Sequence, residues 1–188
     1  LTEPLYHGTS DLIFKQIKAS GLGTRSLLDE LSAWQAWEGL WRMYNDEGLR
    51  VDDVERERCM LEKMGIQNAS GNLNMQHGEV YVCASQETAR IYACRECGSE
   101  FLSNLLLVYR ALKSHRPNTT ADWDEHPAVM FCCRSHSPTV VRISAGLEVT
   151  SLRTEHGETD VTRFLSVWQE AIQAEEPWHM VKLQGVCF

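Results

Sequence analysis

Three short groups of residues carry side chains or backbone groups that could bind and activate a small molecule. The first is His7-Gly8-Thr9, which follows a short apolar run near the start of the chain. The imidazole of His7 can hydrogen-bond a sugar hydroxyl, and the glycine after it lets a flat ligand approach the backbone closely. Because His-Gly dipeptides are also common in ordinary turns, this group alone predicts a ligand contact only weakly.

The second group is a pair of tyrosines, Tyr81 and Tyr92, which are eleven residues apart. They fall on a predicted strand and on the helix after it, an arrangement that can bring two rings to opposite sides of a slot. Such a slot suits a planar heteroaromatic ring, with stacking worth about 1 kcal/mol per ring. The alternative is that both tyrosines pack against the core with bonded hydroxyls.

The third group is Glu175-Glu176, immediately before the apolar segment 177–181. An acid at the start of a terminal strand is well placed to reach a ligand held by the first strand. The alternative is a solvated helix end. Acidic residues at the C-terminus of a helix oppose the helix dipole, which favours a functional role for this pair.

Hydrophobic periodicity and capping residues predict the elements that position these groups. Helices are expected from the Ser10 cap to Gly21 or Gly23, and from the Ser85 cap onward. The remaining predicted helices cover 26–65, 99–113 and 160–174, with a loop over 114–125. The predicted strands cover 4–10, 79–84, 128–133, 139–144 and 178–186. This order favours an α+β fold over a repeating βαβ sheet.

The segment 26–65 is rich in tryptophan, and its large apolar side chains recur at helical spacing. They are Leu31, Trp34, Trp37, Leu40, Trp41 and Tyr44. Packing in the core is the preferred interpretation of this stripe, and a face that docks a partner is the alternative.

Length and composition narrow the function classes. The 188 residues predict a single domain, 1–188, large enough to bury a core. A net charge of −8 argues against a nucleic-acid partner, whose phosphates require basic surfaces. No apolar run approaches the roughly 20 residues that span a bilayer, so no membrane partner is expected. The chain begins with Leu1, which indicates a piece of a longer protein whose targeting segment, if any, lies upstream.

The seven cysteines show no disulfide framework, so we expect reduced thiols in a reducing, cytoplasmic compartment. Cys94 and Cys97 form a CxxC pair that would need further ligands to bind zinc. Residues that could supply them are Cys132, Cys133, His115, His126 and His136. Their spacing fits no common zinc module, so packing thiols are the preferred interpretation and no metal is predicted.

Taken together, the three groups occur in an order that resembles the ADP-ribosyltransferase family. More narrowly, they are similar to the His-Tyr-Glu branch that diphtheria-type toxins share with poly(ADP-ribose) polymerases. Gly78-Glu79-Val80-Tyr81 and the step to Tyr92 are the most specific part of the resemblance. The chain departs from the family at Ala89, where a serine often bonds the nicotinamide amide. A second branch, built on Arg, Ser-Thr-Ser and Glu-x-Glu, fits less well, although Gln173-Ala174-Glu175 is similar to its last motif.

The resemblance implies an α+β fold with a split, mixed β-sheet that clamps NAD, and with 26–65 as a helical insertion. His7 is expected to bond the adenosine ribose, and the Gly8 backbone to bond the nicotinamide carboxamide. The rings of Tyr81 and Tyr92 are expected to sandwich nicotinamide. The implied NAD-binding residues are His7, Gly8, Thr9, Tyr81 and Tyr92, and the implied catalytic residues are His7, Tyr81 and Glu176, with Glu175 as the alternative to Glu176.

The implied activity is transfer of a single ADP-ribose unit from NAD to a protein acceptor. Glu176 is expected to bond the 2′-hydroxyl of the nicotinamide ribose and to stabilise the positive charge that develops when nicotinamide leaves. Bacterial effectors of this fold modify host proteins. The expected acceptor is therefore ubiquitin or another host protein, reached in the host cytosol as a secreted effector.

Three alternatives stay open. An RNA 2′-phosphotransferase resembles the same fold and consumes NAD, but it needs basic residues to grip a phosphate. The nearest arginines form no evident cluster in the sequence: Arg25, Arg50, Arg134 and Arg142. A non-enzymatic module that binds NAD or ADP-ribose would keep the fold without turnover. An NAD glycohydrolase would differ from the transferase only in using water as the acceptor.

Overall fold

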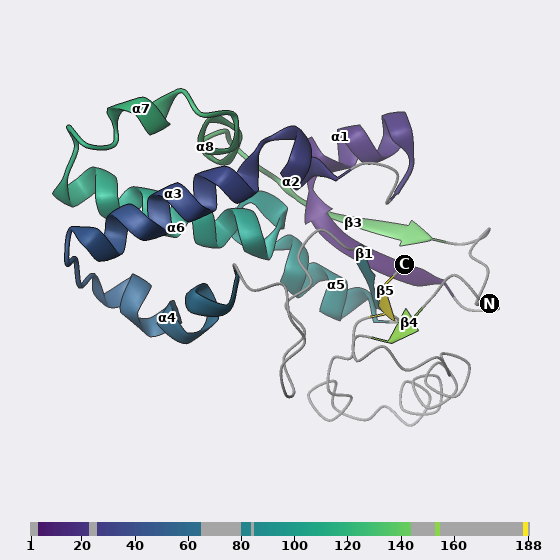
Figure 1. The fold of residues 1–188 in the computed structure, drawn as a ribbon. Coiled ribbons are helices and arrows are strands. Elements are labelled where there is room, and N and C mark those ends of the chain that lie inside the picture. The colour runs from purple at the N-terminus through teal and green to yellow at the C-terminus, as the bar shows by residue number, and fades with distance from the viewer. Residues whose placement is uncertain are drawn as a thin grey trace.

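The computed structural model describes residues 4–22, 26–64, 80–83 and 85–143, together with the backbone of 153–154 and 186–187. Within these ranges the protein combines many helices with a small antiparallel sheet (Figure 1), which confirms a fold of mixed α and β structure. The predicted helix over 160–174, and most of the predicted strand over 178–186, lie outside the described residues.

The strands form two small groups that meet at one point. β1 (Leu5–Ser10) pairs with β3 (Pro138–Ile143), and His7 is opposite Val141 in the register. The second group has the order β2-β5-β4, made of β2 (Tyr81–Val82), β5 (Val186–Cys187) and β4 (Arg153–Thr154). Every pairing in both groups is antiparallel. A single bridge between Tyr6 and Cys83 connects β1 to the chain just after β2.

Serine caps begin the helices that flank β1 and β2, as the sequence predicts. Ser10 caps α1 (Asp11–Ser20) by accepting a hydrogen bond from the Ile13 N–H, and Gly21 ends this helix. Ser85 caps α5 (Gln86–Ala93) in the same way through the Thr88 N–H. Both helices therefore start at the end of a strand, or directly after one, and are held close to the sheet.

The remaining helices form a helical layer, defined here as α2–α4 and α6–α8. Its members are α2 (Leu27–Glu30), α3 (Ala33–Asp46), α4 (Asp52–Met64), α6 (Glu100–His115), α7 (Ala121–Asp124) and α8 (Pro127–Cys132). A 3₁₀ turn, η1 (Glu96–Gly98), joins α5 to α6. Figure 1 shows this layer on one side of the molecule and the strands with α5 on the other. The predicted helical span 26–65 is confirmed as three helices joined by short links at 31–32 and 47–51, and residue 65 lies outside the described residues.

Two predictions in this region need correction. The segment 128–133 was predicted to be a strand, but it lies in α8 and its cap. Pro127 occupies the first turn, where its missing N–H is harmless, and His126 Nδ1 accepts a hydrogen bond from the Ala128 N–H. A short apolar run is compatible with either structure, and these start signals decide for the helix. The predicted loop 114–125 contains the short helix α7.

The core of the helical layer is built from the tryptophan stripe of α3 and the apolar face of α6. Trp37, Leu40 and Tyr44 are buried, and Trp34 and Trp41 pack against them. The Trp37 ring stacks on Trp41 with centroids 5.5 Å apart. The core-packing interpretation of the stripe is therefore confirmed. Among the helices that the structure describes, none is both long and apolar enough to cross a bilayer.

Candidate functional site

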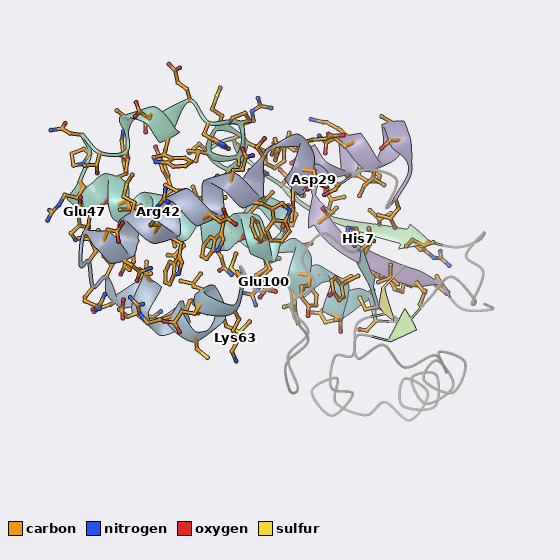
Figure 2. All side chains as sticks on the ribbon, viewed as in Figure 1. His7, Asp29, Arg42, Glu47, Lys63 and Glu100 are labelled. Atoms are coloured by element: carbon orange, nitrogen blue, oxygen red, sulfur yellow. The ribbon has the colours of Figure 1, made fainter. Side chains whose placement is uncertain are left out.

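His7 lies in the middle of β1 (Figure 2) and bonds the first residue of β2. Its Nδ1 is 2.8 Å from the carbonyl oxygen of Tyr81. Because a carbonyl can only accept, Nδ1 carries the proton in this bond. Burial lowers the pKa of His7, although the bond to Tyr81 raises it in part. The neutral ring then presents a lone pair at Nε2, which can accept a hydrogen bond from a hydroxyl.

Gly8 allows α5 to lie directly on β1. A Cβ atom at this position would be 1.9 Å from the carbonyl oxygen of Ala89 and 2.8 Å from the amide nitrogen of Ala93. Any other residue would push the helix away from the strand. The sequence predicts that a flat ligand approaches the backbone at Gly8. On this face of β1, the group that approaches is the backbone of α5.

The peptide groups of Gly8 point to a different side, along the plane of the sheet. Tyr6 exchanges two hydrogen bonds with Cys83, at 2.7 and 2.8 Å. In an antiparallel ladder alternate residues face the same neighbour, so the N–H and C=O of Gly8 also face the β2 side. Beyond the bridge of Tyr6 with Cys83, no further pair between β1 and β2 is described. The donor and the acceptor of Gly8 therefore lie side by side where this described pairing ends.

Thr9 has its side chain on the same face of β1 as His7. The residue is 1% exposed, and its hydroxyl has no hydrogen-bond partner among the described residues. An unmet buried hydroxyl destabilises a fold by about 1–3 kcal/mol. This predicted site residue is thus buried beside His7, with an unused polar atom.

Tyr81 and Tyr92 lie on the two elements that adjoin β1. Tyr81 is half-buried on β2, and its backbone carbonyl is the partner of His7. Tyr92 is 42% exposed on α5, next to Ala93 and one helical turn after Ala89, the residues that contact Gly8. The structure therefore brings His7, Gly8 and Tyr81 together and places Tyr92 on the helix that covers Gly8.

The acidic pair Glu175-Glu176 lies outside the described residues, as do Gly78 and Glu79. The chain beyond the acidic pair returns to the site, because β5 pairs with β2 and Cys187 is opposite Tyr81. The predicted late strand, 178–186, overlaps β5 at Val186, and the rest of it lies outside the described residues.

Cys83 is a residue of this region that the sequence did not indicate. It is buried at the bridge to β1, and its thiol lies 3.4 Å from the carbonyl oxygens of both Tyr6 and Ser85. Burial raises the pKa of this thiol to about 12. A cysteine directly after a predicted strand gives no sequence signal for such a role, because the bridge depends on how β1 pairs.

Of the other described cysteines, Cys97 and Cys132 are packing residues, whereas Cys59, Cys94 and Cys133 are exposed. Cys97 and Cys132 are buried, and each thiol faces a backbone carbonyl, that of Cys132 at 3.7 Å and that of Leu102 at 3.5 Å. Within the described ranges, no three His, Cys, Asp or Glu residues gather in a way that could hold a metal ion.

Comparison of the chain with known protein families, with curated proteins and with solved structures gives no match. The argument for function therefore depends on the residues themselves. Their arrangement offers a neutral imidazole acceptor, the peptide donor and acceptor of Gly8, and a partly exposed aromatic ring. These groups suit a ligand with sugar hydroxyls, an amide and a planar ring.

Proposed function

We propose that the protein is an NAD-dependent mono-ADP-ribosyltransferase that cleaves the bond between nicotinamide and ribose. The observation that carries this proposal is the contact of His7 with the Tyr81 carbonyl, beside the peptide groups of Gly8, which lie past the last described pair between β1 and β2. Two motifs that are 74 residues apart in the sequence meet at this contact, in the order that resembles the His-Tyr-Glu branch of the family. The division of the described strands into two groups also agrees with the split sheet that the resemblance implies.

The polar groups match NAD in donor and acceptor character. A primary carboxamide carries both N–H donors and a carbonyl acceptor, which complement the C=O and N–H of Gly8. The lone pair of His7 Nε2 complements a ribose hydroxyl. An anionic group would find no donor at a neutral His7, which favours a sugar over a phosphate at this position.

The ring of nicotinamide would stack on the tyrosines. Tyr92 exposes enough of its ring for such a contact, and Tyr81 is half-buried on the adjoining strand. Ala89 offers only its backbone and a methyl group where related enzymes often have a serine. The carboxamide would therefore be held mainly by Gly8.

In the reaction, the glycosidic C–N bond breaks and its electron pair leaves with the nicotinamide nitrogen. The ribose becomes oxocarbenium-like, and the carboxylate of Glu176 stabilises this charge more strongly in the transition state than in bound NAD. A nucleophile of the acceptor then bonds the anomeric carbon and loses its proton. Glu175 is the alternative carboxylate for this role.

The acceptor in this proposal is a protein, with ubiquitin or another host protein as the candidate. The net charge of −8 suits a partner with a basic face. It also disfavours RNA as the acceptor. Of the arginines that could grip an internal phosphate, the described ones lie on three separate segments: before α4, after α8 and in β3.

The first experiment measures nicotinamide release from NAD by the purified chain, with and without cell lysate, and follows tagged NAD into proteins. Release that increases with lysate and labels a protein band is the expected result. Release without labelling would instead establish a glycohydrolase or a nucleic-acid acceptor. No release and no NAD binding would contradict the enzyme assignment.

The acidic pair provides the matched variants. Glu176→Ala should reduce turnover by orders of magnitude and leave NAD affinity nearly unchanged, because its contribution is confined to the transition state. Glu175→Ala is the control and should retain most of the activity. If Glu175→Ala is the inactive variant, the carboxylate assignment is wrong.

A further inference from the structure

Cys83 makes four polar contacts across the junction between β1 and β2. Its N–H donates to the Tyr6 carbonyl at 2.8 Å, and its own carbonyl accepts from the Tyr6 N–H at 2.7 Å. Its thiol lies 3.4 Å from that same Tyr6 carbonyl and 3.4 Å from the carbonyl of Ser85. The single thiol proton is therefore offered to two acceptors, one on β1 and one at the start of α5.

These contacts form a closed path around the candidate site. Ser85 caps α5 by accepting from the Thr88 N–H at 3.3 Å. One turn later the carbonyl of Ala89 meets Gly8, two residues along β1 from Tyr6. The path thus runs from β1 through Cys83 and Ser85 into α5 and back to β1. A change in the position of Cys83 must alter the distance between α5 and the strand that carries His7 and Gly8.

We propose that Cys83 is a positioning residue for the candidate site, whose thiol holds the start of α5 at a fixed distance from β1. This inference depends on the proposed function in one respect, because the carboxamide of NAD would bind the peptide groups of Gly8, the residue against which α5 packs. Cys83 itself takes no part in the reaction. Its effect reaches the ligand through the placement of Gly8, His7 and Tyr92.

The chemical state of the thiol fits this role. A thiol can donate a hydrogen bond, whereas a thiolate can only accept, and both neighbours of this sulfur are carbonyl acceptors. Burial raises the pKa of Cys83 to about 12, so the proton stays on sulfur throughout the physiological range. The same burial makes it a poor nucleophile, which separates it from the exposed Cys94 at the other end of α5.

The experiment compares Cys83→Ser, Cys83→Ala and the control Cys94→Ala in the full chain. Serine keeps one donor at this position, whereas alanine keeps none. Two quantities are measured for each: the pKa of His7 by NMR of its ring, and the affinity for NAD by calorimetry. Removing the donor should weaken NAD binding by about fivefold, the factor expected for one neutral hydrogen bond.

We expect Cys83→Ala to move the pKa of His7 toward its ordinary value and to weaken NAD binding, with Cys83→Ser restoring both in large part. Cys94→Ala should change neither. Unchanged values for both quantities in Cys83→Ala would overturn the inference, and so would equal losses in Cys83→Ala and Cys94→Ala. If the unmodified chain binds no NAD, the proposed function fails, and the His7 measurement still decides whether Cys83 positions β1.

A measurement on the unmodified chain covers the case in which Cys83→Ala does not fold. The amide hydrogens of Tyr6 and Cys83 should exchange slowly with solvent. NAD should slow this exchange further, because the proposed binding of NAD requires the hydrogen bonds between Tyr6 and Cys83 to be formed. Saturating NAD that leaves both exchange rates unchanged would overturn the inference.

Discussion

In the helical layer, neighbouring elements meet through large side chains, whereas β1 meets α5 through the backbone of Gly8 and Ala89. The stacked rings of Trp37, Trp41 and Tyr44 fill the space beside α6. At Gly8 there is no space to fill, since even one added carbon would be 1.9 Å from an oxygen. The first region gains stability from buried apolar volume. The second gains close contact between two backbones, which fixes the distance of α5 from β1.

The largest change in stability, and one confined to the helical layer, is expected for Trp37→Ala. This side chain is 2% exposed at the centre of the helical layer, and its removal should lower the free energy of unfolding by about 3–5 kcal/mol. NAD affinity of the folded fraction should not change. Denaturant unfolding and calorimetry measure the two quantities, with Met130→Ala, which is 49% exposed, as a nearly neutral control. A loss of NAD affinity in folded Trp37→Ala would show that the two regions are coupled.

Gly8→Ala is expected to have a smaller effect on stability and a larger one on the site. Overpacking against α5 should cost about 1–3 kcal/mol, and the displaced helix should abolish measurable NAD binding. Gly48→Ala is the matched control, because Gly48 has φ +61° but no atom within 4 Å of an added Cβ. Backbone strain there should cost about 1–2 kcal/mol and leave NAD binding intact. If the two variants bind NAD equally, the contact of Gly8 with α5 is not part of the site.

Tyr44→Phe tests a polar contribution inside the helical layer. The Tyr44 hydroxyl accepts from the Val51 N–H at 2.9 Å and donates to Glu55 at 3.2 Å, which ties α3 to the start of α4. Its loss should lower the free energy of unfolding by about 1 kcal/mol. Arg56→Ala removes an exposed ion pair on the same helix and should change it by less than about 0.5 kcal/mol. Equal changes in the free energy of unfolding in the two variants would mean that buried apolar packing, and not the Tyr44 hydrogen bonds, stabilises this region.

The smallest expected effect is a dependence of stability on pH. Burial lowers the pKa of His7 in the sheet region and of His126 in the helical layer, from an ordinary 6.5. Below pH 6.5 the unfolded chain therefore binds more protons than the folded one, and the free energy of unfolding falls as the pH falls. Above that pH neither histidine contributes to the dependence.

Two asparagine variants assign this dependence to each region. His7→Asn keeps a donor for the Tyr81 carbonyl, and His126→Asn keeps a cap for α8, but neither side chain titrates. Unfolding measured from pH 7.5 to 5.5 should depend less on pH in each variant than in the unmodified chain. A variant with an unchanged dependence would show that its histidine is free to protonate in the folded state.

The sequence predicts the elements well where capping and periodicity agree. Ser10 and Ser85 each cap the helix that is predicted after them, and the side chain of each accepts a backbone N–H of the first turn. Ser99, which the prediction includes in the helix 99–113, caps α6 in the same way. These signals are local, so they survive without knowledge of the tertiary fold. The prediction of a strand over the apolar run 128–133 is wrong, because six residues are too few to distinguish a buried strand from a buried helix.

Contacts between distant segments could not be predicted in the same way. The meeting of His7 with Tyr81 followed only from a resemblance, and the spacing of the two residues contains no information about their hydrogen bond. The bridge between Tyr6 and Cys83 had no signal at all. It depends on the register of β1, which is fixed by pairing with β3 more than 120 residues later in the chain.

That bridge also determines how this part of the molecule can move. Two strand groups joined by many ladder pairs would resist both separation and rotation. The described backbone pairing between β1 and the end of β2 is one residue pair, and the bond of His7 to the Tyr81 carbonyl is a second contact across the same junction. Rotation of β2 about Tyr6 and Cys83 would therefore have to break only that one side-chain bond, on the microsecond to millisecond scale typical of such motions.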